Sequence, residues 1–265
     1  MKKYKLLKSD SIEIDDIKLY RIQALKDFGN IRKGDKGGYI RDEKNLSHSG
    51  NTWISGNAWI SGNARIFGHA WISGNAWISG NARISGNTWI SGNARISGNA
   101  RIFGNAWISG NTRIYENARI FGDGEVFGDG EVYGNARVYD NALIRYGRLK
   151  TDIKNLVPYI ASSLNICPIN GKYILYKRVN KISKGNYRSC YNRNFIYKLG
   201  KMARVKNPNM SRKSCSSGIH VSTPNYWEGG NTLIAVEVKV SDIITCQQGK
   251  LRCKAVKVIA EVEDE

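Results

Sequence analysis

Sixteen consecutive hexads fill residues 50 to 145, and this repeat constrains the fold more than any other feature of the chain. It begins GNTWIS, GNAWIS, GNARIF and ends GNARVY, DNALIR, without an insertion or a deletion. An aliphatic residue recurs every six positions, with a small residue two places before it. A period of six fits neither a helix face nor a long strand, but it fits short strands separated by fixed corners. We therefore predict a mainly β fold.

The repeat also predicts which side chains point inward. Side chains alternate along a strand, so the small and the aliphatic residue both face the interior, and the residues flanking the aliphatic one face outward. Glycine and asparagine then occupy the corners, because both adopt left-handed backbone angles more readily than other residues. The composition fits this geometry, since 28 residues are glycine and only 4 are proline.

This spacing resembles the hexapeptide-repeat family, in which three hexads form one triangular coil of a left-handed parallel β-helix. The resemblance implies about five coils, with residues eighteen apart stacked on one face. Many members of this superfamily are trimeric acyltransferases, with a loop extruded from the coils and a catalytic histidine. Here the hexads run unbroken and contain only His69, at a corner position, so we expect no acyltransferase activity.

Stacking residues eighteen apart sorts the outward positions into three columns, and the third column is uninterrupted arginine. Aromatic residues dominate the outward position two places later. We expect this face to bind an anionic ligand or a partner, because stacked like charges need solvent, adjacent rings or an anion to offset their repulsion. In the alternative, the arginines are soluble, β-tolerant residues whose stems cover the rings. The predicted face comprises Arg65, Arg83, Arg101, Arg119, Arg137, Phe67, Phe103 and Phe121.

The tryptophans of the repeat lie in the other two columns, four in the first and two in the second. Each tryptophan buries about 150–250 Å², so together they exceed the few hundred Å² that a monomer normally exposes. We expect them to form an interface with a second subunit or a target, and ladders of self-stacking rings are the alternative. The predicted interface residues are Trp53, Trp59, Trp71, Trp77, Trp89 and Trp107.

The flanks of the repeat form two further predicted domains. Residues 1–49 show short strands and turns that would cap the open end of the coils. Their sequence RIQALKDFGNIRKGDKGGYIRDEKNLSHSGN resembles the N-terminal cap of uncharacterised phage, prophage and bacterial hexapeptide-repeat proteins, some of which carry a nominal transferase label. Residues 146–265 are predicted to form an α+β domain. Its expected helix spans 152–161, and its expected strands span 172–179, 194–198, 218–221, 232–240 and 251–262.

The positive charge belongs mainly to this C-terminal domain. Residues 146–265 carry +13 of the net +19, and no Asp or Glu occurs from Ile153 to Trp227. Lys and Arg neutralise phosphates and aromatic rings stack on unpaired bases, so we expect RNA, single-stranded DNA or a host ribonucleoprotein as partner. The alternative is a solvated basic face. The predicted binding residues are Lys172, Lys177, Arg178, Lys181, Lys184, Arg188, Arg193, Lys198, Lys201, Arg204, Lys206, Arg212 and Lys213.

Two resemblances concern the same domain. The segments YNRNFIYKLG (191–200) and CSSGIHV (215–221) resemble an uncharacterised domain that follows pentapeptide-type repeats in phage and viral proteins. His220, with Arg178 on an early strand and Glu237 on a late one, also loosely resembles ADP-ribosyltransferase cores. The alternative for His220 is a hydrogen-bonded structural histidine.

No other chemistry has a matching pattern. The five cysteines lack C-x-x-C spacing and nearby histidines, so we predict no disulfide framework and no zinc site. A Gly-rich phosphate loop, a Ser-His-Asp set and a metal-ligand cluster are also missing, so we predict no metal, cofactor or catalytic residue. We find no apolar stretch of about 18 residues and no signal-peptide core, and therefore expect a cytoplasmic protein, in the host cytoplasm if a phage encodes it.

Together these observations predict a non-enzymatic, phage-type binding protein. Its basic domain would engage nucleic acid, and its repeat would serve as a docking and oligomerisation scaffold. The resemblance to phage proteins is the reason why we expect a counter-defence or host-takeover role. A purely protein–protein scaffold is the first alternative, and an ADP-ribosyltransferase-like enzyme is the second.

Overall fold

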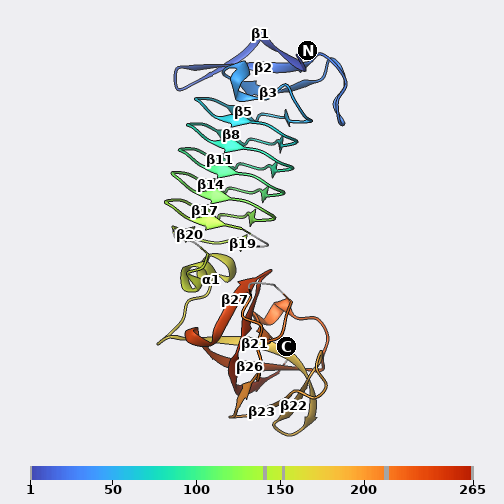
Figure 1. Ribbon diagram of the computed structural model, residues 1–265, viewed down its shortest axis with the longest axis vertical. Coiled ribbons are helices and arrows are strands. Elements are labelled where there is room, and N and C mark those ends of the chain that lie inside the picture. Colours follow the sequence, from blue (N-terminus) through green and yellow to red (C-terminus); the bar gives the residue numbers. More distant parts are fainter. Residues whose placement is uncertain (1, 140–141, 151–152, 212–214, 264–265) are drawn as a thin grey trace. The chain divides into compact units, whose positions relative to one another are not determined.

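The computed structural model describes residues 2–139, 142–150, 153–211 and 215–263. The chain divides into two compact units, Met1–Asn155 (unit 1) and Leu156–Glu265 (unit 2), and each is described by itself (Figure 1). Unit 1 is a β-solenoid with an N-terminal antiparallel segment, and unit 2 is an antiparallel β domain that begins with a short helix. The mainly β fold is therefore confirmed.

The hexads form a stack of two-residue strands (Figure 1). Strands eighteen residues apart pair in parallel and produce three sheets. The first contains β4 (Trp53–Ile54), β7 (Trp71–Ile72), β10 (Trp89–Ile90), β13 (Trp107–Ile108), β16 (Glu125–Val126) and β19 (Leu143–Ile144). The second contains β5 (Trp59–Ile60), β8 (Trp77–Ile78), β11 (Arg95–Ile96), β14 (Arg113–Ile114), β17 (Glu131–Val132) and β20 (Arg148–Leu149). The third contains β6 (Arg65–Ile66), β9 (Arg83–Ile84), β12 (Arg101–Ile102), β15 (Arg119–Ile120) and β18 (Arg137–Val138).

The solenoid has about six turns, slightly more than the sixteen hexads alone predict. Its first sheet holds six strands, and β20 continues the second sheet after the last hexad. Glu131 faces Arg148, a step of seventeen residues instead of eighteen. The ladder of backbone hydrogen bonds therefore tolerates one missing residue at this end.

The interior and the corners show why the hexad has this composition. The aliphatic residues, such as Ile90 and Ile102, are fully buried as predicted. Glycines occupy the corners with positive φ, for example +82° at Gly86. Asparagine also lies at the corners as predicted, but not for the predicted reason, because no asparagine in the described part of the repeat has a positive φ. The asparagine side chains instead bond along the stack, as where Asn93 Nδ2 donates to Asn111 Oδ1 at 2.9 Å.

The N-terminal segment covers the first turn of the solenoid. It contains β1 (Tyr4–Ile14), β2 (Ile17–Ala24), β3 (Lys36–Ile40) and a short 3₁₀ helix, η1 (Glu43–Asn45). Strands β1, β2 and β3 pair antiparallel, and β3 then pairs in parallel with β5. A methyl group at Gly38 would lie 2.3 Å from the Ala58 carbonyl oxygen, so glycine permits this close approach. The ring of Phe28 packs edge-on against Trp53, with centroids 5.5 Å apart.

Unit 2 begins with α1 (Leu156–Leu164), four residues later than the predicted helix start. Its larger sheet has the order β23 (Ile196–Lys198), β22 (Asn186–Ser189), β21 (Lys172–Ser183), β26 (Thr232–Lys239), β29 (Ala255–Val262), β24 (Met202–Arg204). Its smaller sheet has the order β25 (Ile219–Val221), β28 (Lys250–Cys253), β27 (Ile243–Gln247). Two 3₁₀ helices complete it, η2 (Pro224–Tyr226) and η3 (Val240–Asp242). No helix in the described part of the chain has the length and apolar character needed to span a membrane.

The alternation along β21 positions the candidate site. Tyr173, Leu175, Lys177 and Val179 are buried and share one face, which is the inner face of the larger sheet. Arg178 and the other intervening residues lie on the opposite face. One lysine therefore sits in a row of core positions that is otherwise apolar or aromatic.

Candidate functional site

Seven exposed cations lie in one stretch of the chain in unit 2, residues 184–206. This stretch extends from the β21–β22 turn through β22, β23 and β24, and β22 and β23 are paired neighbours. None of the seven side chains makes an ion pair with any residue that the structure describes. We call these cations the basic patch: Lys184, Arg188, Arg193, Lys198, Lys201, Arg204 and Lys206. Tyr191 lies within this segment, with 82% of its surface exposed.

Three other predicted cations contribute less free charge. The ammonium of Lys172 lies 3.1 Å from the Glu237 carboxylate, and that of Lys181 lies 2.6 Å from the Glu261 carboxylate. Arg178 is half-buried on the outer face of β21. The basic surface is therefore narrower than predicted and centres on β22 to β24.

The prediction that Lys177 belongs to the exposed nucleic-acid-binding surface is wrong. It is only 3% exposed, because the alternation of β21 turns it to the inner face. Predicted residues Arg212 and Lys213 lie outside the described residues.

The arginine column is confirmed in register. Arg101 pairs with Arg83 on one side and Arg119 on the other, and the side chains are exposed. Among the described residues, none of the column's guanidinium groups makes an ion pair or lies over an aromatic ring. Four of them, with a ladder of asparagines, line a groove of about 550 Å³: Arg65, Arg83, Arg101 and Arg119.

The aromatic residues of this third face contact each other rather than the arginines. Phe103 stacks on Phe121 at 5.5 Å between centroids, and Phe121 stacks on Tyr139 at 5.2 Å. Phe67 and Phe103 are exposed. Since the rings do not cover the guanidinium groups, water or an anion is left to offset their repulsion.

The tryptophans separate into different environments. Trp53 is 1% exposed beneath Phe28 and cannot belong to an open interface, which corrects that prediction. On the second sheet, Trp59 and Trp77 are half-buried and stack at 4.4 Å. On the first sheet, Trp71 is half-buried, whereas Trp89 and Trp107 are 52% and 55% exposed. The most exposed tryptophans are therefore on the first sheet.

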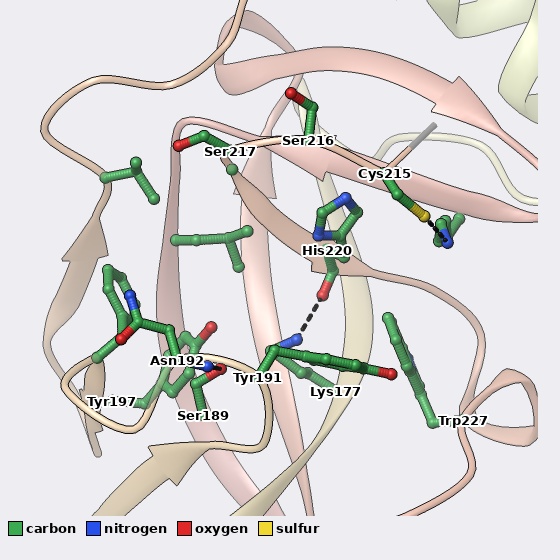
Figure 2. A pocket seen from close by; sticks show the side chains of 15 residues that line it. Lys177, Ser189, Tyr191, Asn192, Tyr197, Cys215, Ser216, Ser217, His220 and Trp227 are labelled. Carbon is green, nitrogen blue, oxygen red and sulfur yellow. Dashed lines mark hydrogen bonds between the residues drawn. The ribbon is translucent and has the colours of Figure 1, made fainter. Parts of the chain in front are cut away.

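Sequence reasoning missed a cavity of about 420 Å³ inside unit 2. Its walls come from the inner face of β21 to β23, the 190–195 loop, the segment leading into β25, Trp227, and Lys250 on β28. Figure 2 shows Tyr191, His220 and Trp227 around the Lys177 amine. The signal in the sequence was Lys177 itself, a lysine at an inward position of an alternating strand.

Lys177 makes two contacts in this cavity. Its Nζ donates a 3.1 Å hydrogen bond to the carbonyl oxygen of His220 and lies 4.8 Å from the centre of the Trp227 ring (Figure 2). Burial lowers the pKa of Lys177 to about 8. A second cation, Lys250, lines the cavity, and its Nζ lies 3.2 Å from the sulfur of Cys215.

The residues of the enzyme alternative are not assembled into one site. Arg178 and Glu237 lie on the outer face of the larger sheet, whereas His220 lines the inner cavity. His69 occupies an exposed corner of the solenoid, where its backbone N–H donates to the Gly86 carbonyl oxygen at 3.0 Å. Throughout the described ranges, no group of three or more His, Cys, Asp and Glu side chains is arranged to hold a metal ion.

Comparison with known families supports the solenoid. The repeat is similar to the YdcK beta solenoid repeat, whose family model matches residues 76–92, 94–110 and 132–146. All three matched segments lie in the stacked strands of unit 1. No match to a curated protein was found.

Proposed function

We propose that this chain is a non-enzymatic nucleic-acid-binding protein whose basic patch holds RNA or single-stranded DNA, free or within a nucleoprotein complex. The observation that carries the proposal is the series of seven exposed cations between residues 184 and 206, without an ion-pair partner among the described residues. Such charges neutralise phosphates and release counterions from the nucleic acid. Tyr191 offers an exposed ring on which an unpaired base can stack.

The arginine column supports a second contact for the same class of ligand. Its exposed guanidinium groups repeat at the strand spacing of about 4.8 Å and form a straight cationic row. A linear polyanion fits such a row better than a compact anion does. The solenoid would then act as a docking scaffold.

The setting of this activity follows only from the resemblances of the flanks. A phage or prophage origin would place the protein in the host cytoplasm, where host ribonucleoproteins are available targets. Counter-defence or host takeover is then the proposed role.

The decisive experiment measures the salt dependence of binding to a labelled single-stranded RNA of about 20 nucleotides. Fluorescence anisotropy between about 50 and 300 mM salt gives the slope of log K against log salt concentration. The variant Arg188→Gln/Lys198→Gln should reduce this slope by about 1.4, because each neutralised phosphate of a single strand contributes about 0.7 to it.

The matched control is Lys172→Gln/Lys239→Gln, which removes two positive charges at the opposite end of β21. It should leave the slope near the wild-type value. Absent binding at low salt, or equal slopes for both double variants, would contradict the proposal.

Self-association is a second candidate function, favoured by the exposed Trp89 and Trp107 on one sheet. About half of each ring is exposed, so a second copy that covers both would bury about 150–250 Å² of ring surface. Trp89→Glu/Trp107→Glu should convert an oligomer to a monomer in sedimentation velocity. The control Arg83→Glu/Arg101→Glu places glutamate at the same strand position of the third face and should leave the mass unchanged. A wild-type monomer at high protein concentration would exclude this function.

A further inference from the structure

The cavity of unit 2 contains a buried cation among aromatic rings, and it shares only Tyr191 with the nucleic-acid-binding surface proposed above. We propose that this cavity binds a nucleoside phosphate, with the phosphate beside Lys177 and the base against the rings of Tyr191 and Trp227. This inference does not rest on the nucleic-acid proposal, because Lys177 lies on the inner face of the sheet and Arg188 of the basic patch on the outer face.

The size of the cavity suits a small organic ligand. Its volume of about 420 Å³ lies within the range of about 300–1,000 Å³ typical of such sites. The lining combines rings with hydroxyl and amide groups, including Ser189, Asn192, Ser216 and Ser217 (Figure 2). Mostly apolar walls with a few convergent polar groups are the usual composition of a ligand site.

The charge of the cavity selects an anion. Lys177 and Lys250 line it, and no Asp or Glu is among the described lining residues. Lys250 adds to the lowering of the pKa of Lys177, after the larger effect of burial. Two neighbouring lysines match the double charge of a phosphate, which lysine binds as a point charge.

A purely structural role does not explain why a lysine occupies this buried position. An ammonium has three N–H donors, and the His220 carbonyl oxygen accepts only one. The two strands do not depend on this bond, because Tyr176 and Ser222 already exchange backbone hydrogen bonds of 2.8 and 3.0 Å. A methionine would fill the same core position without the cost of burying a charge.

The rings are placed to hold a planar group. The Trp227 Nε1 donates to the Tyr176 carbonyl oxygen at 2.9 Å, which fixes the indole beside the Lys177 amine. Figure 2 shows the Tyr191 ring in front of Lys177 and the Trp227 ring to one side of it. A base between these rings leaves its phosphate close to the ammonium.

The test is titration calorimetry of the full chain with AMP, GMP, CMP and UMP in turn. At least one nucleotide should bind, and its nucleoside, which lacks the phosphate, should bind at least tenfold more weakly. Lys177→Met should weaken nucleotide binding by a similar factor. Tyr191→Ala, at an exposed position that does not endanger folding, should weaken it by about tenfold because a base can no longer stack there.

The number of protons taken up on nucleotide binding provides a second test, because a lysine with a purely structural role would not change it. At about pH 8 the phosphate is fully ionised, and a bound anion should raise the protonation of Lys177. Titrations in buffers of different ionisation enthalpy should then show uptake of about half a proton, which Lys177→Met abolishes. The other titratable groups that line or act on this part of the cavity are Cys190, Tyr191, Tyr197, Cys215, His220 and Lys250.

The variant Arg188→Gln/Lys198→Gln separates this site from the basic patch. It should bind the nucleotide as the wild type does, even though its RNA binding changes. Three results would each overturn the inference: no binding of any of the four nucleotides, equal affinity for nucleotide and nucleoside, or undiminished binding by a folded Lys177→Met protein.

Discussion

The ammonium of Lys177 donates to the carbonyl oxygen of His220 across 3.1 Å, and this joins the inner face of β21 to β25. The bond satisfies one donor of a charged group that is 3% exposed. A carbonyl offsets only part of the lost hydration of an ammonium. The position therefore costs stability in the absence of a ligand, as ligand sites commonly do.

We expect Lys177→Met to be more stable than the wild type at neutral pH, by about 2–3 kcal/mol. The pKa of Lys177 is about 8 in the folded protein, below the ordinary 10.5, so the unfolded chain binds more protons between these values. Wild-type stability should therefore rise with pH through this window, and the advantage of the variant should shrink. Urea unfolding of both proteins between pH 7 and about 10 measures the difference. Lys184→Met, at an exposed position, is the control and should show no such trend.

The solenoid could be predicted because the period of the repeat determines the register of its strands. A step of eighteen residues places Arg101 between Arg83 and Arg119, and the structure shows that pairing. The role of asparagine could not be predicted from its backbone preference. Residues such as Asn93 gain more from bonding the next turn through their side chains than from a left-handed backbone, which glycine already provides.

The cavity and the exposure of individual residues could not be predicted from local pattern. Trp53 has the same place in its hexad as Trp89, but Phe28 of the N-terminal segment covers it. The cavity combines β21, the 190–195 loop, β25 and β28, so it exists only after the long-range pairing of unit 2. Of its lining, Lys177 was predicted only as part of an exposed nucleic-acid-binding surface, and the segments 191–200 and 215–221 were singled out only by resemblance.

Gly86→Ala should destabilise unit 1 far more than Gly147→Ala. Both glycines have positive φ, at +82° and +58°, but a methyl group at Gly86 would lie 2.4 Å from the Gly104 carbonyl oxygen, whereas Gly147 has open space. Left-handed strain alone costs about 1–2 kcal/mol, and the clash adds to it at Gly86. Tryptophan fluorescence during urea unfolding follows unit 1, since six of the seven tryptophans lie in the repeat. Equal losses for the two variants would show that the turns are not packed this closely.

Arg101→Gln should stabilise the solenoid at low salt. Arg101 faces an arginine on each side, so the change removes two repulsions, each worth about 0.2–1 kcal/mol. Arg113→Gln is the matched control, because Arg113 faces Arg95 on one side and pairs with Glu131 at 3.6 Å on the other. The control should therefore change stability little. Salt screens exposed charges, so the gain from Arg101→Gln should fade at about 1 M salt.

A short polyanion should also stabilise the wild type more than Arg101→Gln, because an anion on the column offsets the same repulsion. If Arg101→Gln is no more stable than Arg113→Gln at any salt concentration, water alone hydrates the column well enough, and the polyanion contact proposed for this face loses its physical basis.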